Sequence, residues 1–303
     1  MNRAACRVAL AQYPITFLKS WAEYRAKLTD IAASARNGGA ALLVLPEYGS
    51  MELASLLPAG VSEDLHAQLD GMQALAIRFV ELHAELAATY GLHLLASSFP
   101  TRGEDGAVRN RAWLLAPDGS RGYQDKLQMT RFERERWGIQ SGSEIRVFDT
   151  VLGRIGVAIC YDAEFPLIVR RQAEAGAEII LVPSCTDTLA GYWRVRIASQ
   201  ARALENQCFV VQAPTVGMAP WSAAVDVNVG AAGAFGPIDT ALSSDGILML
   251  GELDRPGLVF ADLDPAALAR IRAGGEVFND ADWNRQLGPA SRDVLVCPIS
   301  LVR

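Results

Sequence analysis

The chain has 303 residues, of which 50% are hydrophobic and 20% are charged, a balance typical of a domain with a substantial core. The formal net charge of −6 gives no electrostatic basis for binding nucleic acid or an anionic membrane. No apolar run approaches the ~18 residues of a spanning helix, and the N-terminal stretch is no convincing signal peptide. The five cysteines are sparse and odd in number, which favours a reduced, soluble, cytoplasmic protein.

Hydrophobic periods of two and of 3.6 residues alternate from the start of the chain. Ser20–Glu23 has the form of a capping box, and the helix that it opens runs to Gly38-Gly39. The other elements predicted in this part are the strands Arg7–Gln12, Ala41–Leu45 and Leu92–Ser97 and a second helix over Met72–Tyr90.

The rest of the chain continues this alternation of strands and helices. We expect strands at Arg111–Leu115, Gly122–Leu127, Arg146–Asp149, Arg154–Cys160, Glu178–Val182, Cys208–Gln212, Ile247–Glu252 and Gly257–Leu263, and helices at Pro166–Ala175, Trp193–Glu205 and Asp264–Gly274. No repeat or linker divides the chain, so residues 1–274 predict one α/β domain whose sheets are sandwiched by helices. Residues 275–303 lack a clean period and are expected to form an extended tail.

Three expected strands end in a residue that can do chemistry: Glu47, Lys126 and Cys160. Strand ends in α/β folds are common places for active sites, because the core holds them rigidly and leaves their side chains accessible. Cys160 is the best nucleophile candidate, since a helix start and a neighbouring lysine would lower the pKa of its thiol. Glu47 is placed to move a proton, and Lys126 to stabilise an oxyanion.

Each of these residues also has a structural interpretation. Cys160 could be a buried core cysteine, Glu47 a solvated loop residue and Lys126 a surface strand residue. The three histidines (His66, His83 and His93) lie beside no plausible nucleophile, and we expect neither a histidine-based triad nor a metal site. Taken alone each signal is weak, but the three strand ends together favour a catalytic site.

The order of these segments resembles the nitrilase, or carbon–nitrogen hydrolase, superfamily. The motifs that carry the resemblance cover nearly the whole chain: VALAQ near the start, LVLPE at Glu47, NRAWLLAPDG and YQDK before and at Lys126, GVAICYDAEFP at Cys160, and RALENQ at 202–207. The segment TRFERERWG is similar to the family's T-x-x-E-R-x-x-W-G pattern, with Glu133 at its glutamate position.

This resemblance implies an α-β-β-α sandwich that associates through its sheets and C-terminal tail into a homodimer or larger assembly. It also implies a Glu47–Lys126–Cys160 triad with Cys160 as the covalent nucleophile, a second glutamate at Glu133, and the backbone N–H of Tyr161 as an oxyanion donor. Glu135 is the rival of Glu133 in the same charged run, and is better explained as solvated. Neither a metal nor an organic cofactor is expected.

The substrate is expected to be a small-molecule linear amide, because Tyr161-Asp162 follows the cysteine where nitrile-cleaving members typically have Trp-Glu. Action on nitriles or N-carbamoyl compounds and thioester-based acyl transfer stay open, and a non-catalytic scaffold is the least favoured alternative. Arg194 and Arg196 do not form a convincing pair for a carbamoyl amino acid. Candidate pocket residues are Tyr48, Trp137, Tyr161, Tyr192 and Trp193.

Overall fold

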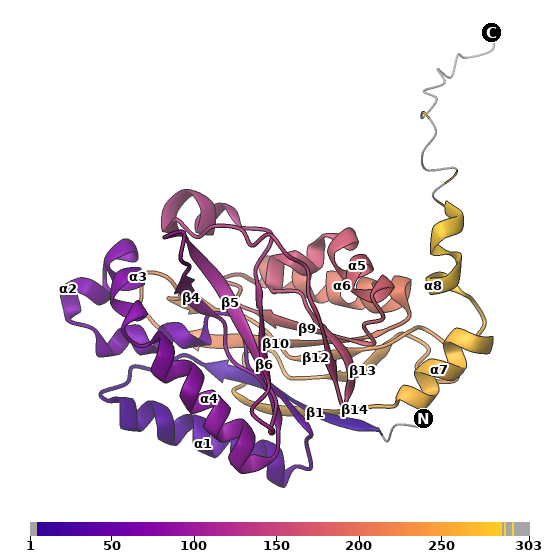
Figure 1. Cartoon of the computed structure of the whole chain (residues 1–303), viewed down its shortest axis with the longest axis horizontal. Helices are drawn as coiled ribbons and strands as arrows, with labels where there is room; N and C mark the ends of the chain where they lie inside the picture. The colour runs from indigo at the N-terminus through magenta and orange to yellow at the C-terminus, as the bar shows by residue number, and fades with distance from the viewer. Residues whose placement is uncertain (1–4, 287, 289–292, 294–303) are drawn as a thin grey trace.

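The computed structural model describes residues 5–286, 288 and 293. The chain forms four layers (Figure 1). Helices α1 (Trp21–Asn37) and α4 (Ala76–Tyr90) cover one side, helices α5 (Pro166–Glu174) and α6 (Leu189–Asn206) cover the other, and the strands lie between them. The expected α-β-β-α sandwich is confirmed.

The strands form a continuous sheet that folds into two halves. The first half contains β1 (Cys6–Pro14), β2 (Leu42–Val44), β3 (His93–Leu95), β4 (Phe99–Arg102), β5 (Val108–Leu115), β6 (Arg121–Asp125) and β14 (Gly257–Leu263). The second half contains β7 (Val147–Thr150), β8 (Gly153–Val157), β9 (Ile179–Ser184), β10 (Phe209–Met218), β11 (Val227–Asn228), β12 (Gly233–Phe235) and β13 (Ile247–Leu250). Strand β1 joins the halves, because its end pairs with β10 through Tyr13 and Thr215.

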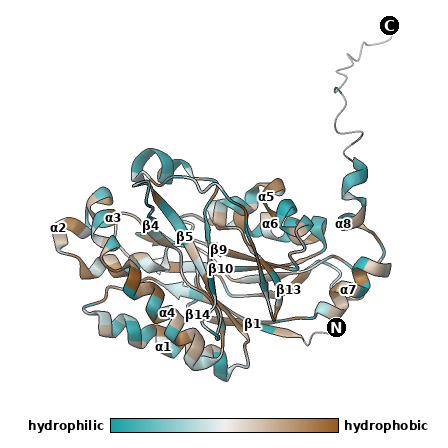
Figure 2. Cartoon of the chain, in the orientation of Figure 1, coloured by the Kyte–Doolittle hydropathy of each residue, from teal (hydrophilic) through white to brown (hydrophobic). Residues whose placement is uncertain are grey.

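Alternating side chains of β1 separate two hydrophobic layers. Val8 and Leu10 belong to the core between the two sheet halves, whereas Ala9 and Ala11 belong to the layer beneath α1 and α4. Figure 2 shows hydrophobic colours along the strands inside the sandwich. The site-bearing strand ends are therefore held from both faces, which limits their movement.

Local capping signals account for the helix starts. The Ser20 half of the predicted capping box is present, since Ser20 Oγ accepts the N–H of Glu23 at 3.3 Å, whereas the Glu23 carboxylate accepts the N–H of Lys19, one residue before the cap, at 2.8 Å. Helix α5 starts at Pro166, as predicted. Helix α6 starts one turn before its predicted position, because Thr188 Oγ1 caps it by accepting the N–H of Gly191 at 3.1 Å.

The predicted helix over Met72–Tyr90 is wrong in its first part. The chain forms α2 (Ala59–Ser62), then α3 (Leu65–Gln73), and turns before α4. The amide of Gln73 bonds to the backbone of β4, donating to Pro100 O at 2.8 Å and accepting from the N–H of Arg102 at 2.8 Å. These contacts fix the direction of α3. The sequence pattern did not predict strands β4, β11 and β12.

The start of the expected C-terminal tail is helical and docks on its own subunit. After α7 (Pro265–Gly274), residues Asn279–Asp282 form α8 and Trp283–Gln286 form a 3₁₀ turn. Gln207 donates to Val277 O at 3.0 Å, and Arg170 forms an ion pair with Asp280 at 3.0 Å. The expectation of an extended segment is therefore wrong for this part, because tertiary contacts order it.

Some apolar residues of this region remain open to solvent. Val277 and Phe278 are 50% and 41% exposed. Of the other tail residues on which the expected oligomer interface depends, Trp283 is half-buried with its ring 4.8 Å from the Arg170 guanidinium, whereas Leu287, Val294 and Leu295 lie outside the described residues. Within the described ranges, no helix combines the length and the apolar character needed to cross a bilayer.

A buried polar cluster around Glu52 ties β1, α1 and the 3₁₀ segment Gly49–Leu56 together. The Glu52 carboxylate is inaccessible to solvent and accepts hydrogen bonds from Tyr13 Oη at 2.5 Å and from the N–H of Thr16 at 2.7 Å. It also pairs with Lys27, whose ammonium group lies 4.1 Å from the centre of the Tyr13 ring. Because both charges are largely buried, each depends on the other.

We predict that Glu52→Gln lowers the free energy of unfolding by about 3 kcal/mol, because it leaves the Lys27 ammonium buried without its counter-ion. Urea denaturation followed by tryptophan fluorescence measures this change. The matched control is Glu85→Gln, which removes an exposed pair with Arg25 and should cost less than about 1 kcal/mol. Equal costs for the two variants would contradict the prediction.

Candidate active site

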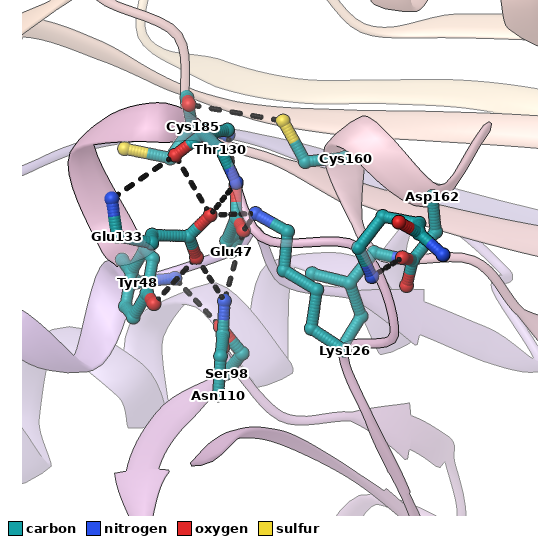
Figure 3. Close-up of polar contacts among 12 residues, drawn as sticks. Glu47, Tyr48, Ser98, Asn110, Lys126, Thr130, Glu133, Cys160, Asp162 and Cys185 are labelled. Carbon is teal, nitrogen blue, oxygen red and sulfur yellow. Dashed lines mark hydrogen bonds and ion pairs between the residues drawn. The ribbon is translucent and has the colours of Figure 1, made fainter. Parts of the chain in front are cut away.

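The structure brings Glu47, Lys126, Glu133 and Cys160 together at one place (Figure 3). Glu47 follows β2 through Pro46, Lys126 follows β6 directly, and Cys160 opens a 3₁₀ helix, Cys160–Glu164, after β8. Glu133 opens a π-helical turn that ends at Trp137. The four side chains come from both sheet halves and are almost fully buried. The predicted cluster of chemistry-bearing residues is therefore present.

Lys126 occupies the centre of the cluster. Its Nζ lies 2.7 Å from Glu47 Oε1 and 2.7 Å from Glu133 Oε2, so one ammonium group bridges two carboxylates. Burial lowers the pKa of Lys126, but the charges of Glu133 and Glu47 outweigh it, and the pKa lies well above its ordinary value. The lysine is therefore a fixed positive charge.

Glu47 is held by groups from three segments besides its own. Asn110 Nδ2 donates to its Oε1 at 2.9 Å, and the backbone N–H of Cys185 donates to its Oε2 at 3.0 Å. Burial raises the pKa of Glu47, and the opposing charge of Lys126 does not fully offset this effect. A carboxylate with a raised pKa is a better proton acceptor, which suits acid–base work.

Glu133 has a different environment. Tyr48 Oη donates to its Oε1 at 2.7 Å, and the N–H and the Oγ1 of Thr130 both donate to its Oε2 at 2.9 Å. Burial raises the pKa of Glu133, but Lys126 and these donors outweigh it and hold the pKa below its ordinary value. The rival Glu135 pairs with Arg131 at the surface, at 2.7 Å.

Two residues of the site adopt the left-handed backbone conformation. Cys160 has φ 50° and Tyr48, which follows Glu47, has φ 52°. A non-glycine residue in this region costs of order 1–3 kcal/mol, and such strain persists only where the surroundings impose it. Cys160 Sγ then lies 3.8 Å from the carbonyl oxygen of Cys185. Left-handed backbone therefore occurs at the nucleophile candidate and at the residue that follows Glu47, and the surrounding contacts hold both in place.

The resting state of the Cys160 thiol differs from the sequence-based expectation. Burial raises its pKa well above the ordinary value, the negative charge of Glu47 raises it further, and Lys126 acts in the opposite direction. The expectation that a lysine and a helix start lower the pKa was wrong in its net sign, because it left out burial. This direction favours the protonated thiol over the thiolate at Cys160.

A cavity of about 360 Å³ opens in front of the cluster. Of the five candidate pocket residues, Tyr48, Trp137 and Tyr161 line it. Trp137 serves as a fixed wall, because its ring lies 4.7 Å from that of Tyr48 and its Nε1 donates to Leu65 O at 3.1 Å.

Tyr192 and Trp193 do not line this cavity, which corrects the prediction for both. Their neighbours Gly191, Arg194 and Val195 face the cavity instead. Successive residues on a helix point about 100° apart, so residues that share a stretch of sequence do not share a face.

The two arginines of this stretch also diverge. Arg194 lies at the cavity edge and pairs with Glu164 at 3.4 Å, whereas Arg196 is buried against the ring of Phe235 and donates to Gln200 at 2.9 Å. They therefore form no pair for a carboxylate, as expected from the sequence.

Sequence reasoning missed the side chain that supports Glu47. This side chain is Asn110, which lies within the motif NRAWLLAPDG. Burial alternates along β5 and places Asn110 on the inward face with Val108 and Ala112. A polar residue at an inward strand position was the available signal, because such groups need buried partners. Cys185 also lines the cavity. Over the described ranges, no group of three or more His, Cys, Asp or Glu side chains is arranged to hold a metal ion.

Comparison with known proteins agrees with this geometry. Residues 7–266 match the profile of the family described as Carbon-nitrogen hydrolase. The chain belongs to the carbon–nitrogen hydrolase family. It is 35% identical over 291 residues to the probable hydrolase YhcX of Bacillus subtilis, an alignment that covers 95% of this chain and 54% of YhcX. It is 32% identical over 144 residues to the deaminated glutathione amidase of Yersinia enterocolitica, covering 44% and 50% of the two chains.

The chain therefore spans about half the length of these two curated relatives. Among solved structures, Nit3 of Saccharomyces cerevisiae, a member of branch 10 of the nitrilase superfamily, is similar with a TM-score of 0.70 and 20% identity. This match covers 90% of this chain and 94% of Nit3 and shows the shared fold. The resemblance read from the motifs is confirmed as family membership.

We predict that iodoacetamide modifies Cys160 before Cys6, Cys185 and Cys208, because the Cys160 thiol lies at the cavity beside both Glu47 and Lys126. Because the pKa of Cys160 is raised well above its ordinary value, the rate should still increase with pH above about pH 9. Peptide mass mapping after partial labelling measures the order. Cys160→Ala should abolish turnover and Cys185→Ala should not; equal labelling of both thiols, with activity surviving Cys160→Ala, would contradict the assignment.

Proposed function

We propose that the protein hydrolyses a small linear amide to a carboxylic acid and ammonia or an amine, through a thioester on Cys160. The observation that carries this proposal is the Lys126 ammonium held between Glu47 and Glu133 beside the thiol, at the floor of a cavity. A nucleophile, a proton acceptor and a fixed positive charge are the parts that acyl transfer requires.

In the first half-reaction, Glu47 takes the thiol proton while Cys160 Sγ forms a bond to the amide carbon. The carbonyl oxygen becomes an oxyanion, which Lys126 Nζ and the backbone N–H of Tyr161 stabilise. That N–H donates to no acceptor in the described part of the chain, so it is free for this role. Glu47 then returns the proton to the nitrogen, the carbon–nitrogen bond breaks, and a thioester remains.

In the second half-reaction, water replaces the departed nitrogen. Glu47 accepts a proton from water as its oxygen attacks the thioester carbon, and the same two donors stabilise the second oxyanion. The carbon–sulfur bond then breaks, the acid leaves, and the proton on Glu47 returns to sulfur. Glu133 keeps its charge throughout and holds Lys126 in place, which matches its lowered pKa.

Two observations favour an amide over a nitrile. Tyr161-Asp162 follows the nucleophile, as in the amide-cleaving branch of the family that the motifs resemble. The Yersinia enterocolitica relative is an amidase, named for deaminated glutathione. An amide also needs a proton delivered to its leaving nitrogen, and the raised pKa of Glu47 suits that transfer.

We predict that kcat/KM for an amide exceeds that for the nitrile of the same acyl group by at least about tenfold. Ammonia release over paired amides, nitriles and N-carbamoyl compounds measures this, with intact-mass detection of the trapped acyl-enzyme. Hydroxylamine added to the assay tests acyl transfer, because a hydroxamate formed at a matched rate would identify a transferase. A nitrile preferred tenfold, with acid as product, would make the enzyme a nitrilase.

We further propose that the protein works as a homodimer or larger assembly joined through α5 and α6. Exposed hydrophobic side chains recur along α6 at helical spacing and continue onto α5: Leu189, Trp193, Ile197, Leu204 and Leu167. Figure 1 places both helices in the same outer layer. A surface of this kind on a water-soluble sandwich is typical of a protein–protein contact.

We predict that light scattering finds at least a dimer at micromolar concentration and that Ile197→Asp shifts the protein toward monomer, because it places a charge in the apolar contact. The matched control is Ile77→Asp on α4, which is 75% exposed on the opposite outer layer and should leave the assembly unchanged. A wild-type monomer, or equal effects of both variants, would contradict the proposed interface.

A further inference from the structure

Asp162 is a buried carboxylate that the proposed reaction does not use. It lies two residues after the nucleophile and is inaccessible to solvent. Its Oδ1 accepts the backbone N–H of Gln128 at 2.7 Å and that of Leu127 at 3.1 Å. Its Oδ2 accepts the N–H of Ile159 at 3.2 Å and also lies 3.2 Å from the N–H of Leu127. All its partners are backbone donors.

These donors belong to two segments that carry the two halves of the site. Leu127 and Gln128 directly follow Lys126, while Ile159 directly precedes Cys160. The backbone of Lys126 is otherwise anchored on its own side, donating to Asn110 O at 2.8 Å and accepting from the N–H of Gly142 at 2.7 Å. The Asp162 carboxylate therefore connects the lysine segment to the cysteine turn across the two sheet halves.

The cysteine turn needs such a support. Cys160 has φ 50°, a conformation that a cysteine keeps only when neighbouring contacts impose it. The bond from Ile159 to Asp162 closes the turn around Cys160 and Tyr161, because it joins the residue before them to the residue after them. The orientation of the Tyr161 N–H is set by this turn.

We propose that Asp162 is a positioning residue, which sets the distance between the two oxyanion donors, Lys126 Nζ and the Tyr161 N–H. The effect of Asp162 on turnover rests on the proposed function, whereas its effect on the distance between the two donors does not depend on the substrate. Preorganised donors stabilise an oxyanion only when they lie within a few tenths of an ångström of the position it will occupy.

Asp162→Asn tests this role with little change of shape. One amide oxygen can keep the bonds to Leu127 and Gln128, but the NH₂ group then faces the N–H of Ile159, where a donor meets a donor. The link between the two segments is broken on one side. The matched control is Asp239→Asn, a buried aspartate that accepts the N–H groups of Ala241 and Glu276 at 2.8 and 3.1 Å and does not line the cavity.

The first readout is steady-state kinetics on the best amide of the ammonia-release screen. We expect Asp162→Asn to lower kcat about 10- to 100-fold with KM within about threefold, because oxyanion stabilisation acts in the transition state. Asp239→Asn should keep kcat within about threefold at a comparable loss of melting temperature. If Asp162→Asn does not fold, Asp162→Ser, which leaves no buried charge, takes its place.

The second readout needs no turnover. Butanal adds reversibly to the Cys160 thiol as a hemithioacetal whose oxygen meets the same two donors, and protection of Cys160 from iodoacetamide gives its Kd. We expect Asp162→Asn to raise this Kd by at least about tenfold and Asp239→Asn to leave it unchanged. If Asp162→Asn raises the Kd for butanal while the wild-type enzyme hydrolyses none of the amides, the proposed function is overturned and the positioning role is supported.

The proposal fails if Asp162→Asn keeps both the wild-type kcat and the wild-type Kd for butanal. It also fails if the variant loses activity only in proportion to its stability and to the same extent as Asp239→Asn, since that result identifies a residue that supports the fold alone. A kcat loss with an unchanged Kd for butanal counts against it too, because the distance between the donors would then be intact.

Discussion

The bridge from the Lys126 ammonium to two buried carboxylates is the interaction on which the rest of the site depends. Three charges are removed from water at this point, and each carries a desolvation cost of several kcal/mol that only well-placed partners offset. The cluster is therefore stable in one arrangement, in which the Cys185 N–H and Tyr48 Oη donate to the two carboxylate oxygens that Lys126 does not contact. Because Cys160 and Cys185 follow strands of the second sheet half, the two halves must close on each other before the site exists.

The same burial shapes the nucleophile. Cys160 is buried beside this cluster, and burial and the charge of Glu47 raise the pKa of its thiol. The raised pKa favours the protonated thiol, and in the mechanism that we propose Glu47 accepts this proton as the bond to carbon forms. The strained backbone at Cys160 and the hydrogen bonds of Asp162 then fix the positions of the site residues rather than their charges.

Much of the architecture follows from local signals along the chain. Ser20 and Pro166 start helices where the capping rules place them, and the alternation along β1 separates the two hydrophobic layers. Glu47, Lys126 and Cys160 were found because each interrupts an apolar strand at its end, and Glu133 because a motif surrounds it. Such features are visible in sequence because a strand or helix imposes its own period on the residues that it buries.

What the sequence by itself determined is therefore the layered α/β fold, the family and the residues of the reactive cluster. The tertiary structure alone decided three features. The chain breaks before α4, where Gln73 bonds to β4, and Arg194 rather than Tyr192 or Trp193 faces the cavity. The Asp162 carboxylate accepts hydrogen bonds from segments of both sheet halves. The tertiary structure also decided the net direction of the Cys160 pKa, because desolvation depends on everything packed around a group. Each of these features arises between residues far apart in the chain, and no local period or spacing records such contacts.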